Sequence, residues 1–300
     1  MTKLAAQAQL PIAFAGIPKT IDNDIAIMDS SFGFATSCEV AAQMIQSGYV
    51  EATCVIHGVG LIKVMGRHSG YIAMMASLAH NNVDFCIVPE NPYELDGPNG
   101  LYSQVYARIM QQGHAVIVVA EGAEDGLINP AEKFTQEVKK DGSGNAIGND
   151  VGEVLKNKLV ENIKKKFNLS INLKYIDPTY AIRSVPSNAS DTIMCAKLAQ
   201  NAVHGAMAGY TAFSTGVVRN AVSFIPIKTI NEAGSNKISV YDRAWQRLLG
   251  NMRQKSLVNK QFKKAAQEKI DKDERDREMR FDAIKERIQR EDNEREDLNK

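Results

Sequence analysis

Short apolar runs alternate with longer amphipathic segments along most of this chain, and this alternation limits its fold more than any other feature. The runs at 85–88 and 115–119 are apolar at every position, and Gly or Pro lies close to their ends. Between them, 101–112 carries apolar residues at helical spacing and stops at Gly113. Strands that are apolar on both faces are typical of parallel sheets covered by helices. The chain is therefore predicted to be an α/β protein with a doubly wound, mostly parallel sheet.

The same reasoning predicts the other main elements. Asn188 or Ser187 is expected to cap the last long helix, because both side chains can accept hydrogen bonds from free backbone N–H groups. Ser69 is expected to cap the helix that follows it, and a surface turn is expected at 141–145. Further helices are predicted over 34–48, 69–80, 151–166 and 190–209, and extended segments over 10–17, 54–57 and 60–64.

The composition changes abruptly after about residue 240. From 260 to 300 nearly every residue is charged or polar, and Phe281 is the single aromatic residue after position 262. Apolar positions do not repeat over several heptads, so a coiled coil is the less favoured alternative to a solvated helix or a disordered segment. We expect a domain over 1–250 and a charged helical or disordered tail over 251–300 that adds little to the core.

The charge balance excludes several classes of partner. The chain has 36 basic and 35 acidic residues, for a net charge of +1. That balance gives no general attraction to nucleic acid or to a membrane surface. No stretch approaches 18 consecutive apolar residues, and the first nine residues are too polar for a signal peptide. The expectation is a soluble cytoplasmic protein in which any phosphate site is local.

The segment 18–24 reads PKTIDND and concentrates chemistry in seven positions. It offers two carboxylates, a hydroxyl and an ammonium group. It follows the apolar run 10–17, so it falls at the carboxyl end of a predicted strand, where open α/β sheets bind ligands. Such a cluster can support phosphoryl transfer. A turn rich in Asp and Asn that caps the next element explains the same residues equally well.

This segment, with Phe32-Gly33-Phe34, resembles the catalytic loop of the 6-phosphofructokinases. The resemblance extends from about residue 12 to about residue 228, and its order and spacing are similar to the long plant- and protist-type ATP-dependent enzymes. It implies a phosphofructokinase fold. The other motifs that carry it are MGR at 65–67 followed by SGY at 69–71, VPENP at 88–92, AEG at 120–122 and YIDPTYAIR at 175–183.

The resemblance implies roles for the matched residues of the first motif. Asp22 would be the base that accepts the proton of the sugar hydroxyl. Asp24 would balance charge near the phosphates and is a tentative Mg²⁺ ligand, while Lys19 would follow the transferred phosphoryl group. Thr20, Ile21 and Asp22 would line the substrate.

Later motifs imply the remaining substrate contacts. Arg67 would clamp phosphate oxygens from a loop shared with Met65 and Gly66. Glu121 would accept hydrogen bonds from fructose hydroxyls. The sugar phosphate would be held by the segment Tyr180, Ala181, Ile182 and Arg183.

The Gly-Gly-Asp-Gly or Gly-Gly-Asp-Asp loop that precedes this motif in the family does not occur in the sequence. In the family it cradles the donor phosphates, helps to bind magnesium and separates ATP users from pyrophosphate users. We therefore expect an N-terminally truncated phosphofructokinase that, when isolated, transfers phosphoryl groups poorly or not at all. The implied reaction is phosphoryl transfer from ATP to the C1 hydroxyl of fructose 6-phosphate in glycolysis, giving fructose 1,6-bisphosphate, by a homodimer or homotetramer. A pyrophosphate-dependent enzyme and a non-catalytic regulatory subunit are the alternatives.

Overall fold

The structure is a computed structural model that describes residues 2–134, 139–140, 146–147 and 150–298. It divides into two compact units, each described here by itself. The turn expected at 141–145 lies outside the described residues. Unit 1 comprises Met1–Ala35, Ser187–Asn236 and Asp271–Lys300, and unit 2 comprises Thr36–Pro186 and Lys237–Ile270.

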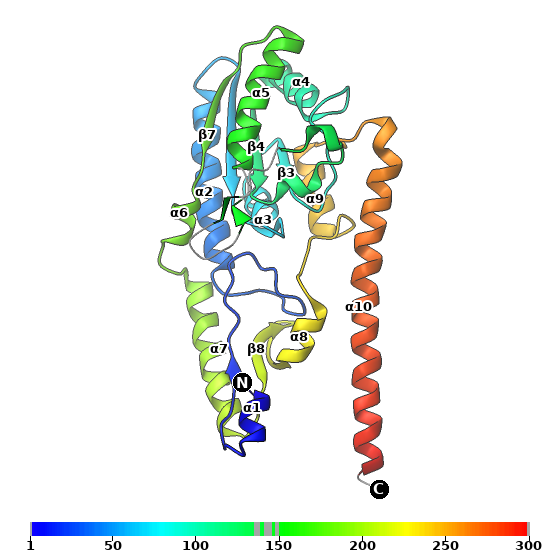
Figure 1. Cartoon of the computed structure of the whole chain (residues 1–300). Coiled ribbons are helices and arrows are strands. Elements are labelled where there is room, and N and C mark those ends of the chain that lie inside the picture. The colour runs from blue at the N-terminus through cyan, green and yellow to red at the C-terminus, as the bar shows by residue number, and fades with distance from the viewer. Residues whose placement is uncertain (1, 135–138, 141–145, 148–149, 299–300) are drawn as a thin grey trace. The chain divides into compact units, whose positions relative to one another are not determined.

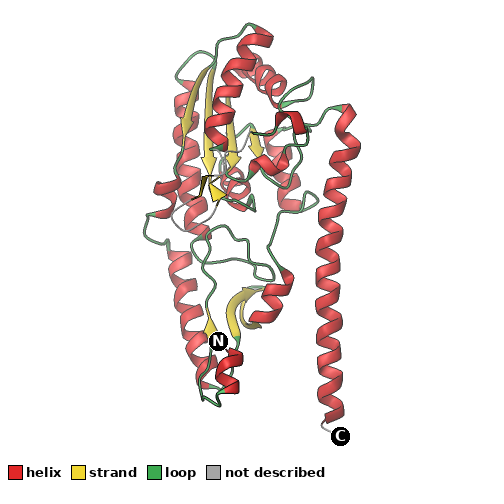
Figure 2. Ribbon diagram, viewed as in Figure 1, coloured by secondary structure: helices red, strands yellow, loops and turns green. Residues whose placement is uncertain are grey.

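Unit 2 is built on a four-stranded parallel sheet with helices on both faces (Figures 1 and 2). Its strands lie in the order β3-β4-β2-β7, so the predicted parallel sheet is confirmed. Helices α4 and α5 cover one face, and α2 and α3 cover the other. The bounds are β2 (Gly58–Val64), β3 (Phe85–Ile87), β4 (His114–Ala120), β7 (Asn172–Ile176), α2 (Phe34–Thr53), α3 (Tyr71–Ala79), α4 (Leu101–Gln112) and α5 (Val151–Phe167).

The two-residue period of a strand decides which side chains meet which helices. Leu61 of β2 and Ile117 of β4 belong to one buried cluster with side chains of α4 and α5. Ile62 points to the opposite face, toward Gly48 of α2. A Cβ atom at Gly60 would lie 2.6 Å from the Gly48 carbonyl oxygen, so glycine here allows the helix backbone to approach the sheet.

Unit 1 has a smaller mixed sheet. Strand β8 (Phe213–Val218) pairs in parallel with β1 (Ala15–Gly16) and antiparallel with β9 (Ala221–Pro226). Helix α7 (Ala189–Met207) packs on this sheet, and Asn188 caps it as predicted, accepting from the Asp191 N–H at 3.0 Å. Helix α8 (Ile227–Ala233) follows β9.

The remaining elements are short, apart from one helix. Among the described residues, no helix combines the length and the apolar character needed to cross a membrane. These elements are α1 (Thr2–Gln7), η1 (Ala123–Gly126), η2 (Pro130–Glu132), β5 (Lys139–Lys140), β6 (Ala146–Ile147), α6 (Thr179–Arg183), α9 (Arg243–Met252), η3 (Lys260–Phe262) and α10 (Lys263–Leu298).

Three sequence predictions about local structure were wrong. The run 10–17 is not a buried strand: only Ala15–Gly16 is paired, on one side, and Leu10 is 53% exposed. The run 54–57 is a turn, because α2 continues to its edge and His57 adopts φ 53°. Helix α3 begins after Gly70 rather than at a Ser69 cap.

The C-terminal segment is helical, which is one of the two states, helical or disordered, that were expected for the tail. Most of α10 faces solvent, but the expectation that the tail has too little apolar surface to contribute to a core was wrong. Ile284 is 7% exposed and packs with Ala26 and Ala233 in unit 1. A boundary at residue 250 stays a prediction.

Candidate active site

The PKTIDND loop lies in unit 1 between β1 and α2, and the hydroxyl of Thr20 ties its two aspartates together. Thr20 Oγ1 donates to Asp24 Oδ1 at 3.0 Å and accepts from the Asp22 N–H at 3.1 Å. Lys19 is exposed and Ile21 is half-buried. The Thr20 hydroxyl thus binds both the carboxylate of Asp24 and the backbone amide of Asp22, which fixes the spacing of these two residues.

Asn23, which the sequence reasoning passed over, holds the loop from inside. It is 6% exposed and adopts φ 56°, a left-handed conformation that Asn tolerates better than most residues. Its Oδ1 accepts from the Ser31 N–H at 2.9 Å, and its Nδ2 donates to the Asp29 carbonyl at 3.4 Å. An Asn between two Asp residues in a turn was the available signal.

The loop is attached to the rest of unit 1 at two further places. The carbonyl oxygen of Asp24 accepts from the Asn236 N–H at 2.7 Å and from Ser235 Oγ at 3.2 Å. Downstream, the carboxylate of Asp29 accepts from the Asn220 N–H in the β8–β9 turn at 2.8 Å. These bonds fix the backbone on which Asp22 and Asp24 are carried.

In unit 2, the MGR and AEG motifs lie side by side because β2 and β4 end together. Val64 pairs with Ala120, and the Gly122 N–H donates to the Gly66 carbonyl at 2.9 Å. A Cβ atom at Gly122 would lie 1.9 Å from the Arg67 carbonyl oxygen, closer than atoms can approach. Gly66 adopts φ 127°. The close contact of the two loops therefore requires glycine at 122, and Gly66 is required by its positive φ and by the Ser69 carbonyl oxygen, 2.2 Å from where its Cβ atom would lie.

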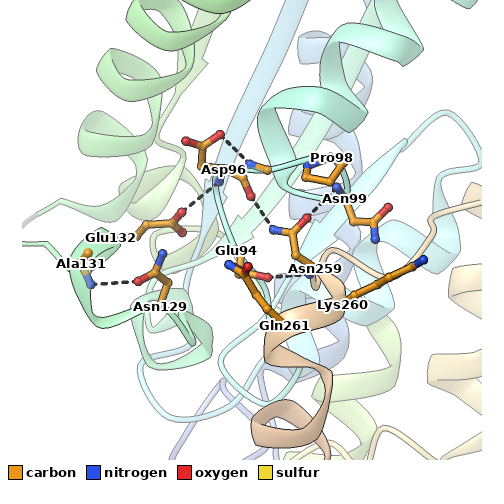
Figure 3. A pocket seen from close by; sticks show the side chains of 11 residues that line it. Glu94, Asp96, Pro98, Asn99, Asn129, Ala131, Glu132, Asn259, Lys260 and Gln261 are labelled. Atoms are coloured by element: carbon orange, nitrogen blue, oxygen red, sulfur yellow. Dashed lines mark hydrogen bonds between the residues drawn. The ribbon is translucent and has the colours of Figure 1, made fainter.

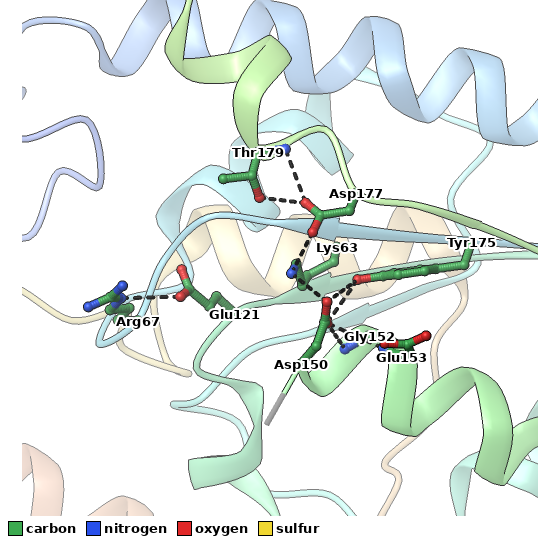
Figure 4. Close-up of polar contacts among 9 residues, drawn as sticks. All are labelled: Lys63, Arg67, Glu121, Asp150, Gly152, Glu153, Tyr175, Asp177 and Thr179. Atoms are coloured by element: carbon green, nitrogen blue, oxygen red, sulfur yellow. Dashed lines mark hydrogen bonds and ion pairs between the residues drawn. The ribbon is translucent and has the colours of Figure 1, made fainter. Parts of the chain in front are cut away.

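Arg67 and Glu121 meet across this contact (Figure 4). Arg67 Nε lies 3.1 Å from Glu121 Oε1, with the two side chains 57% and 37% exposed. An exposed pair of this kind adds about 0 to 1 kcal/mol to stability. Either partner can therefore exchange its contact for a ligand at small cost, and Met65 beside them is half-buried.

The YIDPTYAIR motif forms the end of β7 and the short helix α6. Tyr180 is 83% exposed, and Ala181 and Arg183 are exposed as well. The helical geometry places Tyr180 and Arg183 on one side, as their spacing predicted. Ile182 is 3% exposed, so its side chain belongs to the core and only its backbone can face a ligand.

A charged network anchors this motif to β2 (Figure 4). Lys63 Nζ lies 2.7 Å from Asp177 Oδ2 and 3.1 Å from Asp150 Oδ2. Tyr175 donates its hydroxyl to Asp150 at 2.8 Å, and Thr179 donates to Asp177 at 2.5 Å. The network ties together the carboxyl ends of two strands and the first residue before α5.

The network also sets the protonation of its members. Burial opposes the charge on Lys63, but hydrogen bonds to the two carboxylates outweigh it and raise the pKa of Lys63. Burial works against the Asp177 charge too, yet the contacts from Lys63 and Thr179 lower its pKa. Sequence reasoning missed Lys63. Its signal was the charge inside an otherwise apolar strand, GLIKV.

Glu90 of the VPENP motif is a buried structural carboxylate. Its Oε1 accepts from the Gly70 N–H at 3.0 Å and from the Ile238 N–H at 3.1 Å. Burial raises the pKa of Glu90, although those hydrogen bonds act in the opposite direction. The residue joins the loop after β2 to the segment before α9.

Unit 2 also has a hollow of about 970 Å³, drawn in Figure 3, that none of the matched substrate residues lines. Its acidic groups already have partners: Glu132 accepts from the N–H groups of Leu95 and Asp96, and Glu94 accepts from the Asn259 N–H at 2.6 Å. These bonds brace three loops. The expected site residues thus form two sets, Thr20 to Asp24 in unit 1 and Arg67, Glu121 and α6 in unit 2.

Comparison with known proteins gives a consistent family. The Phosphofructokinase family model matches residues 1–207. ATP-dependent 6-phosphofructokinase 1 of Arabidopsis thaliana is 48% identical over 250 residues, which cover 83% of this chain and 52% of that protein. The ATP-dependent 6-phosphofructokinase of Borreliella burgdorferi is 41% identical over 248 residues, covering 81% and 54%. The chain thus spans about half the length of these relatives.

Solved structures agree on the fold. A pyrophosphate-dependent phosphofructokinase of Nitrosospira multiformis matches with a TM-score of 0.63 and 20% identity, over 84% of this chain and 62% of that one. Phosphofructokinase from Saccharomyces cerevisiae matches with a TM-score of 0.56 and 18% identity, over 85% and 34%. At these identities the likeness concerns the fold alone.

Proposed function

The chain belongs to the phosphofructokinase family, and from that premise we propose that it carries the sugar-phosphate side of an ATP-dependent 6-phosphofructokinase. The proposed reaction moves a phosphoryl group from ATP to the C1 hydroxyl of fructose 6-phosphate. The observation that carries this proposal is the pairing of Arg67 with Glu121 at the joined ends of β2 and β4. A cation for phosphate and an acceptor for hydroxyl groups on one rim suit a phosphorylated sugar.

In this proposal the unit 1 loop performs the proton transfer. Asp22 accepts the proton of the C1 hydroxyl as that oxygen attacks the phosphorus, which is the task of a general base. Thr20 holds the backbone of Asp22 and the carboxylate of Asp24 in register. Lys19, exposed beside them, neutralises the charge of the moving phosphoryl group.

Magnesium is the metal that the family implies, and the residues present fit it in a limited way. Among the described residues, no group of three or more His, Cys, Asp or Glu side chains could hold a metal ion. Mg²⁺ commonly binds one or two carboxylates and completes its coordination with phosphate oxygens and water. Asp24 offers one such oxygen donor. The ion would offset phosphate charge, and Asp24 would help to hold it.

The unit 2 residues hold the acceptor. Arg67 binds phosphate oxygens, since a guanidinium group can donate two hydrogen bonds to one phosphate. Glu121 accepts from sugar hydroxyls, and Tyr180 and Arg183 bind the sugar phosphate from α6. We propose a homo-oligomer located in the cytoplasm as the working form, as expected for a glycolytic enzyme of this family.

A chimera tests the function. The matched 250-residue segment would replace its counterpart in the Arabidopsis thaliana ATP-dependent 6-phosphofructokinase 1. Fructose 1,6-bisphosphate formation would be followed by ³¹P NMR with ATP or with pyrophosphate as donor. Turnover with ATP supports the proposal. Turnover with pyrophosphate but not with ATP would show that pyrophosphate is the phosphoryl donor. Binding of fructose 6-phosphate without turnover by either donor would indicate a regulatory subunit.

A further inference from the structure

Helix α10 touches the segment that follows the PKTIDND loop. Ile284 of α10 is 7% exposed and forms a buried cluster with Ala26 and Ala233, and Ile27 packs against it. Ala26 and Ile27 follow the motif after one intervening residue, Ile25. All of these residues belong to unit 1. The charged C-terminal helix therefore contacts the chain two residues after Asp24.

A second contact joins α10 to α8 one turn further along. Arg287 donates to Glu232 at 2.9 Å, to Thr229 at 3.0 Å and to both carboxylate oxygens of Glu291 at 2.9 Å. Its side chain is 18% exposed. Arginine bound to carboxylates through several hydrogen bonds is the stronger and more directional type of ion pair. Arg287 thus fixes the position of α8 against α10.

The end of α8 leads straight to Asp24. The helix ends at Ala233, and Gly234 turns the chain with φ 74°. The next two residues, Ser235 and Asn236, both donate to the carbonyl oxygen of Asp24. An unbroken series of contacts therefore runs from Arg287 through α8 to the backbone of Asp24.

An independent observation, the backbone of Ile27, points the same way. Ile27 adopts φ 77°, a left-handed conformation that is unfavourable for a β-branched side chain. Such a residue stays in place only where surrounding contacts hold it. The buried cluster against which Ile27 packs includes Ile284 of α10. Loss of that contact would let the loop relax toward an ordinary conformation.

We propose that α10 stabilises the conformation of the PKTIDND loop at 18–24, and that Ile284 and Arg287 are positioning residues for Asp24. This role of α10 is called the brace below. The proposal takes the task of Asp24 from the proposed function, but the contacts stand without it. Because Arg287 acts through ion pairs that are partly open to solvent, salt weakens the brace. The geometry of the loop is thereby coupled to ionic strength.

Hydrogen exchange on the full 300-residue chain tests the brace without any substrate. The readout is the Asn236 amide, which donates to Asp24, resolved by NMR or by mass spectrometry of short peptides. In Arg287→Met and Ile284→Ala this amide should exchange about tenfold faster, because local opening becomes easier. Arg290→Met is the matched control, since this exposed arginine donates to the Glu286 carbonyl within α10 itself. Amides of β4 report on any unfolding of unit 2.

Two further variants keep the proposal falsifiable if a substitution disturbs folding. In Arg287→Lys the exchange rate of the Asn236 amide should lie between the rates in the native chain and in Arg287→Met. Ile27→Gly placed in the Ile284→Ala background should restore protection at Asn236, since glycine adopts φ 77° without strain. Faster exchange confined to α10, or an equal effect of Arg290→Met, would overturn the proposal. A chimera that lacks turnover would refute the proposed function and leave this result unaffected.

Discussion

At the scale of single residues, Arg67 and Glu121 form a weak ion pair with each other, but each group can form strong hydrogen bonds with a ligand. Their separation of 3.1 Å and their exposure leave both groups free to bind a ligand. A substrate would replace this ion pair with two new contacts. Sugar hydroxyls would donate to the Glu121 carboxylate, and phosphate oxygens would accept from the Arg67 guanidinium group. We therefore propose that the pair acts in substrate binding rather than in stability.

A Glu121→Gln substitution in the chimera tests this assignment. A charge-assisted hydrogen bond contributes about 1.5 to 3 kcal/mol, so KM for fructose 6-phosphate should rise roughly 10- to 100-fold with little change in kcat. Asp125→Asn, on an exposed neighbour, is the control and should change neither constant. A fall in kcat at constant KM would instead assign Glu121 to the chemical step.

Glu90 gives a prediction about pH. Its pKa in the folded chain is raised by burial, above the value of about 4.3 for a free glutamate. The folded state therefore holds the proton more tightly, and the buried charge lowers stability above the folded pKa. Glu90→Gln keeps an oxygen that can accept from Gly70 and Ile238, so it should be more stable than the native chain at pH 7.

The advantage of Glu90→Gln should disappear as the pH falls below about 4.3, where the native carboxyl is protonated in both states. Urea unfolding midpoints at pH 7 and pH 4 measure the difference. Glu51→Gln, at an exposed helix position, should show no such change. A Glu90→Gln chain that is less stable than native at pH 7 would contradict the assignment.

At the scale of elements, the MGR and AEG loops depend on two glycines more than on their charged residues. A Cβ atom at Gly122 would lie 1.9 Å from a backbone oxygen, which no side-chain movement relieves. Gly122→Ala should lower the free energy of unfolding by about 2 to 3 kcal/mol, as overpacking does. Gly250→Ala is the control.

A Cβ atom at Gly250 in α9 meets nothing within 4 Å, and alanine favours a helix over glycine by about 1 kcal/mol. Gly250→Ala should therefore stabilise the chain slightly in the same urea titration. Equal stability of Gly122→Ala and the native chain would show that the two loops do not need this contact.

Element prediction from sequence succeeded for a strand covered on both faces and for a helix with one clear apolar face. The run 115–119 is apolar throughout and became β4, and 101–112 became α4 with Gly113 as its left-handed cap. It failed at 10–17 and 54–57, since apolar composition does not reveal whether a pairing strand exists. The motifs identified the expected site residues, but not Asn23 or Lys63. Asn23 binds residues later in its own loop, and Lys63 binds Asp150 and Asp177 far along the chain; neither set of partners is visible in the sequence.

At the scale of the whole molecule, the C-terminal helix is shared between the two units. Residues 271–298 of α10 contribute Ile284 and Arg287 to unit 1, so their removal should destabilise unit 1 selectively. Burying one large apolar side chain contributes about 1.5 to 3 kcal/mol, which sets the expected loss. Hydrogen exchange of the 271–300 deletion should show lower protection in β8 and unchanged protection in β4.

Equal losses of protection in β8 and β4 after that deletion would show that the helix stabilises both units alike. If protection falls in neither strand, the tail is a solvated segment that stabilises neither unit, as its composition suggests. Deletion of residues 299–300 alone is the matched control.

Asp22→Ser in the chimera tests the proposal that Asp22 is the general base of a sugar phosphotransferase. Serine removes the carboxylate and keeps a small polar group, so sugar binding should be retained. We expect kcat with ATP to fall by roughly 10² to 10⁴ while KM for fructose 6-phosphate stays within about twofold, because base catalysis acts in the transition state. An increase in KM with unchanged kcat would contradict it, and so would full activity of the variant.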